Sequence, residues 1–213
     1  MQKWKTYFYL CAMQSRWLSA FLIKVGRSGR DALRTPDPEA GDSSRWAFLA
    51  ELSELARYAM IVGYVRRLRP GGSVLDVGSS NGVLANELQG DVSHYYGIER
   101  DPASVETAQQ RAISVADFSV ADANTFSTSE KYDVIVFNET IYYLNDPVNV
   151  LRRYSGFLKP GGIIIVSNYV AKHLLRMSNE FAQNFHIVDQ TTVINALGCG
   201  WVIQVIQPAS AAN

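Results

Sequence analysis

The sequence predicts an α/β fold in which helices cover both faces of a mostly parallel sheet of seven strands. Short apolar runs alternate with segments of helical periodicity after residue 70, which is typical of repeated strand–helix–strand units. The end of the chain differs, because two strand-like runs at 186–196 and 201–207 flank a turn that contains Gly198 and Gly200. That spacing is typical of a hairpin, so we expect the last strand to lie antiparallel, at or near an edge of the sheet.

Composition and charge narrow the class of protein. Of the 213 residues, 47% are apolar and 19% charged, which is a globular composition long enough for a sizeable core. Basic and acidic residues both number 20, and this zero net charge argues against an extended nucleic-acid surface. Cys11 and Cys199 form no disulfide framework, and neither they nor the three histidines show metal-ligand spacing. We therefore expect a reduced, cytoplasmic protein with no metal.

The first 44 residues read as a separate helical cap. Residues 7–25 are apolar but are interrupted by polar side chains such as Arg16, so they are poorly suited to spanning a bilayer and fit amphipathic helices better. Residues 27–45 are polar and rich in proline and glycine, as expected for a hinge. We expect 1–44 to form a lid over the site and 45–213 to form the main domain.

The elements of the main domain follow in order. Apolar residues recur at threes and fours over 45–69, which predicts a helix that is either continuous or broken at Gly63. Asp101 is placed to cap a helix that has Pro102 at its first position. The expected strands before the hairpin cover 73–77, 95–99, 117–120, 132–137 and 162–167, and the expected helices between them cover 102–112 and 148–158.

The rest of the chain is organised around the stretch that begins with the strand at 73–77. This short apolar run suits a strand covered on both faces. Gly78 and Gly82 then bracket a tight turn, and a helix begins at Val83. A strand, a glycine turn and a helix start together present free backbone N–H groups to a ligand. The same two glycines would also occur in an ordinary strand-to-helix turn.

Acidic residues at neighbouring strand ends favour a nucleoside ligand. Glu99 follows Gly78 by about 20 positions, the distance at which an acid binds ribose hydroxyls in open parallel sheets. Asp122 ends the next strand, where a carboxylate could accept a hydrogen bond from an adenine amino group. A nicotinamide dehydrogenase is disfavoured, because the dinucleotide fingerprint would need glycines where this chain has Ser80 and Val83.

At this point the chain resembles class I S-adenosylmethionine-dependent methyltransferases, and the resemblance covers roughly residues 45–207. Its order and spacing are those of the family, most similar to small-molecule enzymes of the ubiquinone and natural-product type. The resemblance implies a Rossmann-like fold, S-adenosylmethionine as methyl donor, S-adenosylhomocysteine as product and a small-molecule acceptor. The motifs are VLDVGSSNG (74–82), GIERD (97–101), ADANTF (121–126), YDVIVFNETIYYL (132–144) and LKPGGIIIVSN (158–168).

By resemblance, Glu99 would bind the ribose, and Asp122 with the backbone of Ala123 would hold the adenine. Asn138 and Glu139 would close the site beside the methyl-bearing sulfur, with Tyr142 and Tyr143 on the acceptor side. The full set implied for the cofactor is Asp76, Gly78, Ser80, Gly82, Glu99, Asp122, Ala123, Asn138 and Glu139. A serine at 80 departs from the usual glycine and could donate a hydrogen bond to the methionine carboxylate.

The proton acceptor is the least defined part of the site. Many relatives carry a histidine where this chain has Tyr143, and tyrosine, with a reference pKa of about 10, is a poor base near neutrality. His173 is a second candidate because it follows the fifth strand, and Asn168 and Tyr169 are placed to shape the acceptor pocket. The acceptor atom stays open between nitrogen and oxygen, and so does the alternative of a catalytically silent, cofactor-binding partner subunit.

Overall fold

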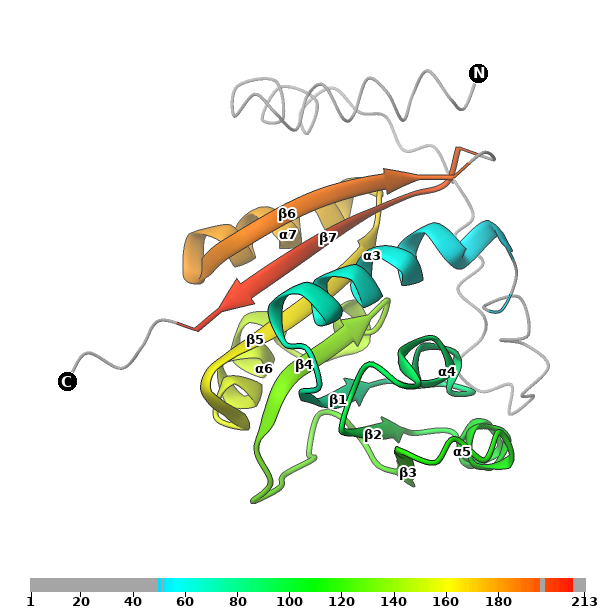
Figure 1. Ribbon diagram of the computed structural model, residues 1–213. Coiled ribbons are helices and arrows are strands. Elements are labelled where there is room, and N and C mark those ends of the chain that lie inside the picture. Colours follow the sequence, from blue (N-terminus) through cyan, green and yellow to red (C-terminus); the bar gives the residue numbers. More distant parts are fainter. Residues whose placement is uncertain (1–49, 51, 196–197, 209–213) are drawn as a thin grey trace.

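The computed structural model describes residues 50, 52–195 and 198–208 (Figure 1). These residues form a sheet of seven strands in the order β3-β2-β1-β4-β5-β7-β6. The first five strands of that order pair in parallel, and β7 runs antiparallel to both β5 and β6. This arrangement confirms the predicted Rossmann-like fold class. The predicted cap at 1–44 lies outside the described residues.

The observed elements lie close to the predicted ones. The strands are β1 (Ser73–Val77), β2 (His94–Glu99), β3 (Ala116–Val120), β4 (Tyr132–Asn138), β5 (Leu158–Tyr169), β6 (His186–Ile194) and β7 (Gly200–Gln207). The helices are α3 (Leu52–Leu68), α4 (Val83–Leu88), α5 (Pro102–Gln110), the short 3-10 helix η2 (Ile141–Tyr143), α6 (Pro147–Ser155) and α7 (Lys172–Asn184). No helix among these described residues is long and apolar enough to cross a bilayer.

Helices cover both faces of the sheet because its central strands are apolar on both sides. Val74 and Val134 face the core beneath α3, α4 and α5, whereas their neighbours Leu75 and Ile135 face the core beneath α6 and α7 (Figure 1). All five residues of β1 are buried. The strand that leads into the glycine loop is therefore held firmly on both faces.

Of the two alternatives at Gly63, the structure shows the continuous helix, because α3 runs without a break from Leu52 to Leu68. A Cβ at Gly63 would meet nothing within 4 Å, so this glycine lies on the outer face. Glycine in a helix interior costs about 1 kcal/mol relative to alanine. The buried residues Ile61, Val62 and Val65 around it anchor the helix on the sheet, and this packing outweighs the local preference.

Asp101 caps α5 as predicted, with Pro102 at the first helical position. Its carboxylate accepts hydrogen bonds from the backbone N–H groups of Ala103 and Ser104 at 3.3 and 3.2 Å. This cap satisfies the helix start, so the acid two residues earlier, Glu99, is left for other partners.

The terminal hairpin is also confirmed. The last strand, β7, lies between β5 and β6, so β6 forms the edge of the sheet. Seven of the eight residues of β7 are buried, as expected for an inner strand.

Candidate functional site

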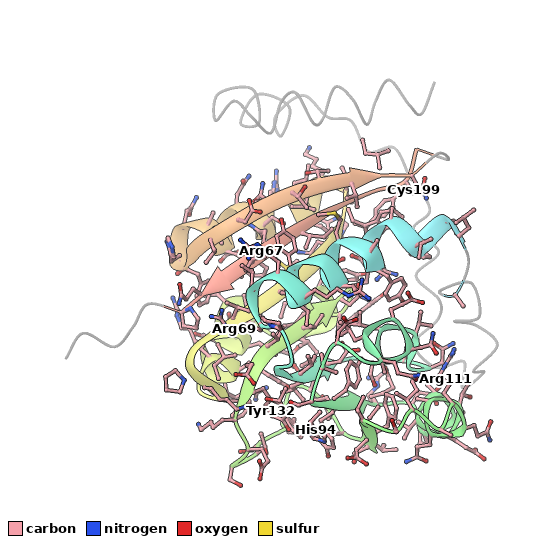
Figure 2. All side chains as sticks on the ribbon, viewed as in Figure 1. Arg67, Arg69, His94, Arg111, Tyr132 and Cys199 are labelled. Atoms are coloured by element: carbon pink, nitrogen blue, oxygen red, sulfur yellow. The ribbon has the colours of Figure 1, made fainter. Side chains whose placement is uncertain are left out.

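The carboxyl ends of the parallel strands bring the predicted residues to one edge of the sheet. The loop after β1 is bonded to the end of β2, because the N–H groups of Gly78 and Ser79 both donate to the carbonyl of Ile98, at 2.8 and 3.0 Å. At the far end of the loop, the Arg111 guanidinium donates to the carbonyl of Asn81 at 2.6 Å (Figure 2). The loop is therefore fixed at both ends.

The glycine loop has left-handed backbone at three positions: Gly78 at φ 80°, Ser80 at φ 48° and Gly82 at φ 74°. Glycine adopts this conformation without strain, whereas serine does so only at some cost. Close neighbours add a second reason for both glycines. A Cβ on Gly78 would lie 2.4 Å from the Thr140 hydroxyl, and one on Gly82 would lie 3.1 Å from the Phe118 ring.

Glu99 ends β2 and holds the glycine loop through its side chain. One carboxylate oxygen accepts from the Ser80 N–H at 3.1 Å, and the other accepts from the N–H groups of Arg100 and Asp101 at 2.7 and 3.0 Å. An ionised carboxylate has about four acceptor positions, so the oxygen that faces Ser80 can accept one more hydrogen bond. Only a donor such as a hydroxyl fits there.

Asp122 lies one strand further along, in the turn after β3. One of its oxygens accepts from the Asn124 backbone and side-chain amides at 2.8 and 3.1 Å. The carbonyl of Ala123 in the same turn accepts from Arg153 at 2.6 Å and from the Tyr154 hydroxyl at 2.9 Å. The turn is therefore tied to α6, while the Asp122 side chain stays exposed.

Asp76 lies inside β1 and is only 2% exposed. The Tyr95 hydroxyl donates to one of its oxygens, and the other has no partner among the described residues. Burial raises the pKa of Asp76 to about 7. The hydrogen bond from Tyr95 acts in the opposite direction but is the weaker effect. Asp76 therefore lies beneath the glycine loop as a carboxyl that is easily protonated.

Four buried polar atoms of this region have no hydrogen-bond partner among the described residues. Buried polar groups in proteins are nearly always hydrogen-bonded. A cluster of unsatisfied ones along a single strand and loop is what a polar ligand would satisfy. They are Asp76 Oδ1, Ser79 Oγ, Ser80 Oγ and Asn81 Oδ1.

Arg57 is part of the site although the sequence predictions did not include it. It projects from α3, is 1% exposed, donates to the Asn138 side-chain oxygen and pairs with Glu54 at 2.9 Å. Its guanidinium also lies 4.6 Å from the centre of the Tyr58 ring. Arg57 stands four residues before Ile61 on the buried face of α3. A charged residue among the apolar positions of that helix face was the sequence signal that could have marked Arg57 as part of the site.

Glu139 joins the ends of β4, β5 and η2. Its carboxylate accepts from the Ser167 hydroxyl at 2.9 Å, the Tyr169 N–H at 3.1 Å and the Tyr142 hydroxyl at 3.2 Å. Burial raises the pKa of Glu139 to about 7, although Arg57 and the three donors oppose that shift. Its backbone is left-handed at φ 60°, which turns the chain out of β4.

The two predicted catalytic residues differ in their surroundings. Tyr143 is 51% exposed, and its ring lies against Tyr142 with centroids 4.5 Å apart. Tyr142 therefore lies between Tyr143 and Glu139 in this chain of contacts. His173 lies exposed in the first turn of α7, and no contact brings it to the Glu139 group. Both catalytic roles stay predictions.

Asn168, predicted to shape the acceptor pocket, is 1% exposed, and its side-chain oxygen and nitrogen have no partner among the described residues. In the described part of the chain, no three histidine, cysteine or acidic side chains come together as a metal site would need.

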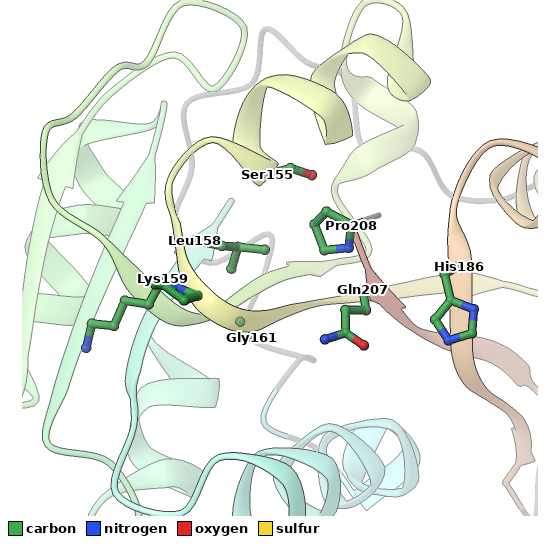
Figure 3. A pocket seen from close by; sticks show the side chains of 9 residues that line it. Ser155, Leu158, Lys159, Gly161, His186, Gln207 and Pro208 are labelled. Carbon is green, nitrogen blue, oxygen red and sulfur yellow. The ribbon is translucent and has the colours of Figure 1, made fainter. Parts of the chain in front are cut away.

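One pocket lies at the other end of the strands, opposite the carboxyl ends of the parallel ones. It is formed where β5 and β6 begin and β7 ends, and its lining includes Lys159, His186 and Gln207 (Figure 3). None of the predicted site residues lines it. This hollow is separate from the carboxyl-end site.

Comparison with known families gives a match to one that is described as a methyltransferase domain, over residues 68–204. The match includes β1 to β6, the glycine loop and every predicted site residue. It confirms the family to which the sequence motifs point.

Individual relatives cover smaller parts. The chain is 34% identical over 110 residues to phosphoethanolamine N-methyltransferase 1 of Arabidopsis thaliana, covering 48% of this chain and 22% of that protein. It is 26% identical over 102 residues to a ubiquinone biosynthesis O-methyltransferase of Aeromonas salmonicida, covering 46% of this chain and 43% of that one. The chain thus spans less than half the length of either relative.

Among solved structures, the fold is similar to N-methyltransferase NodS from Bradyrhizobium japonicum, a complex with S-adenosylhomocysteine. The TM-score is 0.66 at 18% identity, with 78% of this chain and 92% of that chain covered.

Proposed function

The chain belongs to the methyltransferase domain family of class I S-adenosylmethionine-dependent enzymes, and on that basis we propose that it methylates a small molecule. The methyl group goes from S-adenosylmethionine to a nitrogen or oxygen of the acceptor. The observation that carries the proposal is the bond between Glu99 and the glycine loop, together with the unsatisfied polar atoms beside it.

The residues at the strand ends fit the bound donor. Glu99 would offer its remaining acceptor position to a ribose hydroxyl. The second carboxylate oxygen of Asp122, with Ala123 beside it, would accept from the adenine amino group. Ser80 and Asn81 offer polar atoms to the methionine part, where Gly78 and Gly82 let the backbone come close, with Asp76 beneath. Asn138 and Glu139 close the side next to the sulfur. This assignment uses every residue of the predicted cofactor set.

When bound, S-adenosylmethionine supplies a methyl group on a sulfonium, which is a good leaving group. The protein's own contribution is to orient donor and acceptor, and well-oriented reactants gain about 7–11 kcal/mol over free ones. The fixed strand ends and the anchored loop supply that rigidity. Tyr143, Asn168 and Tyr169 lie on the side proposed for the acceptor.

The acceptor class rests on the relatives and on charge. The named relatives act on phosphoethanolamine at nitrogen and in ubiquinone biosynthesis at oxygen, so both atoms stay within the proposal. The zero net charge of the chain argues against a nucleic-acid acceptor. Two cysteines without a disulfide framework fit a cytoplasmic setting, and residues 1–44 are proposed as the lid over the acceptor.

Titration calorimetry of the full chain with S-adenosylmethionine and with S-adenosylhomocysteine tests the site. We expect one binding site for each, weakened by Asp122→Ala and unchanged by the control Asp117→Ala. Asp117 is an exposed carboxylate on β3 that pairs with His94 at 3.2 Å, so its removal should cost little. Absence of heat with both nucleosides, or equal affinity in both variants, would place the ligand elsewhere.

Turnover separates the enzyme from a silent partner subunit. With radiolabelled donor, phosphoethanolamine and a panel of phenols and amines serve as probe acceptors. Transfer of label identifies an enzyme. Tight nucleoside binding without transfer to any of them would favour the alternative of a cofactor-binding subunit.

A further inference from the structure

Glu139 is half-buried at the carboxyl ends of the central strands, where several elements meet. It lies where β4, β5 and η2 meet, and three donors bind its carboxylate: Ser167, the Tyr169 N–H and Tyr142. The Tyr142 hydroxyl can also accept a proton, because a phenol oxygen is both donor and acceptor. The other two donors hold the carboxylate in place.

A path leads outward from this carboxyl group. The Tyr142 hydroxyl donates to Glu139 at 3.2 Å, and the Tyr142 and Tyr143 rings pack with centroids 4.5 Å apart at 50°. Tyr143 is half-exposed. Burial, the Glu139 carboxylate and the hydrogen bond with Tyr143 all raise the pKa of Tyr142, so this hydroxyl keeps its proton unless it gains another. The pair therefore connects the acceptor side to the buried carboxylate.

We propose that Glu139 takes up, through the hydroxyl of Tyr142, the proton that the acceptor loses when it is methylated. This rests on the proposed function and deepens it. The acceptor lone pair forms the bond to the methyl carbon while the carbon–sulfur bond breaks and its electron pair returns to sulfur. The acceptor proton passes to the Tyr142 oxygen, and the Tyr142 proton passes to Glu139. The positive charge on sulfur and the negative charge on the carboxylate disappear together.

This arrangement removes the objection to a tyrosine base. A tyrosine alone would have to hold the negative charge near neutral pH, which its high pKa forbids. Here Tyr142 gives up one proton as it receives another, so it never carries the charge. The proton ends on Glu139, whose pKa of about 7 suits proton uptake at neutral pH far better than an ordinary glutamate would.

The groups around Glu139 determine whether its pKa is raised or lowered. Arg57 from α3 favours the carboxylate, as do the donors Ser167 and the Tyr169 N–H from β5 and Tyr142 from η2. Burial favours the neutral carboxyl group, and its effect on the pKa is larger than that of these groups together. A sulfonium placed beside Glu139 adds one more positive charge, so its arrival should expel the proton from that carboxyl group.

The proposal also defines the acceptor class. Only an acceptor that must lose a proton needs this path, which means a hydroxyl or an amine that arrives protonated. A thioether carries no such proton and would gain nothing from Glu139.

Proton release on nucleoside binding tests the proposal without any acceptor. Calorimetry at pH 7 in buffers of different ionisation enthalpy gives the protons released with S-adenosylmethionine and with S-adenosylhomocysteine, which lacks the sulfonium charge. We expect S-adenosylmethionine to release more protons, by at most about one, because the raised pKa leaves Glu139 partly protonated at pH 7. Glu139→Gln should abolish this difference. Asp117→Asn, which removes an exposed carboxyl outside the site, should retain it.

A kinetic arm uses any acceptor that the wild-type chain methylates. Glu139→Gln and Tyr142→Phe should each lower kcat by about a hundredfold or more. Tyr142→Phe, which keeps the Glu139 carboxylate, should change the KM for S-adenosylmethionine little. The rise of kcat/KM for S-adenosylmethionine with pH through about 7, which reports the free enzyme, should disappear in Glu139→Gln. Tyr142→Phe should still release the extra proton on binding, since it keeps Glu139.

The outcomes separate the two proposals. No binding of either nucleoside overturns the proposed function itself. Binding with equal proton release for both nucleosides, or a release that survives Glu139→Gln, overturns the role of Glu139 and leaves the methyltransferase site standing. If Glu139→Gln fails to fold, Tyr142→Phe provides the test. A kcat of Tyr142→Phe equal to that of the wild type would overturn the path.

Discussion

Gly78 packs directly against Thr140, so closely that a Cβ on the glycine would lie 2.4 Å from the threonine hydroxyl oxygen. Gly78 opens the loop after β1, and Thr140 follows the turn at the end of β4. The loop proposed to hold the methionine part and the turn that carries Glu139 therefore form one rigid unit. Displacing either should disturb the other.

The first prediction concerns this contact. Gly78→Ala adds a Cβ that meets Thr140 and forces alanine into a left-handed backbone at φ 80°. We expect the free energy of unfolding to fall by about 1–3 kcal/mol and the affinity for S-adenosylhomocysteine to fall about tenfold or more. Chemical denaturation and calorimetry measure the two effects.

Gly90→Ala is the matched control, since Gly90 has φ 88° but no atom within 4 Å of its would-be Cβ. It should show the backbone strain without the loss of binding. Equal loss of affinity in both variants would mean that the contact with Thr140 is unimportant for the loop.

The second prediction concerns Glu99. Glu99→Ala removes the acceptor for the N–H groups of Ser80, Arg100 and Asp101, together with the position left for a ribose hydroxyl. A hydrogen bond to a charged group contributes about 1.5–3 kcal/mol. The dissociation constant for S-adenosylhomocysteine should therefore rise by a factor of about ten or more in calorimetry. Glu106→Ala, an exposed position on α5, is the control and should bind normally.

The third prediction concerns pH and the buried Asp76. Its pKa is about 7 in the folded protein against 3.8 for an ordinary aspartate. Between these two values the folded chain binds more protons than the unfolded chain, so this carboxyl makes the free energy of unfolding fall as pH rises. The stabilisation is complete below pH 3.8 and is lost by about pH 7.

Asp76→Asn keeps an oxygen for the Tyr95 hydroxyl but cannot ionise. Urea denaturation at pH 5 and pH 8 should therefore show the variant gaining stability relative to wild type as pH rises, by at most about 1.4 kcal/mol per pH unit. A difference between variant and wild type that is the same at both pH values would refute the raised pKa.

The fourth prediction concerns Arg57. Arg57→Met leaves Glu54, whose side chain is 14% exposed, without its partner and Asn138 without its donor. Breaking a buried ion pair from one side costs about 3–5 kcal/mol, and we expect a loss of that order in thermal or urea unfolding. Arg66→Met provides the comparison on the same helix, because Arg66 pairs with Asp91 at 2.7 Å while 58% exposed. It should cost at most about 1 kcal/mol.

Most of the fold could be predicted because its signals are local. Strand-length apolar runs alternate with helical periods, and Asp101 with Pro102 marks a helix start that the structure confirms. Strand-end acids such as Glu99 were also visible in the sequence, since the carboxyl ends of parallel strands meet at one edge.

The missing parts depend on contacts between distant residues. Arg57 reaches Asn138 across 81 positions, and its charge made a buried location on α3 look unfavourable. Glu139 meets Ser167 across 28 positions, and it does so because the backbone turns left-handed at Glu139. The apolar periodicity of the sequence does not predict that turn. The path from Tyr143 to Glu139 could therefore be seen only in the structure.

The position of β7 inside the sheet has a consequence for how the protein is made. During synthesis β6 emerges first, yet its only neighbour in the sheet is β7, which comes later in the chain. Until Gln207 has left the ribosome, β5 exposes a bare apolar edge and β6 has nothing to pair with. Until β7 pairs with both strands, their edges expose backbone groups that another strand could bond, so we expect pairing between nascent copies at this hairpin.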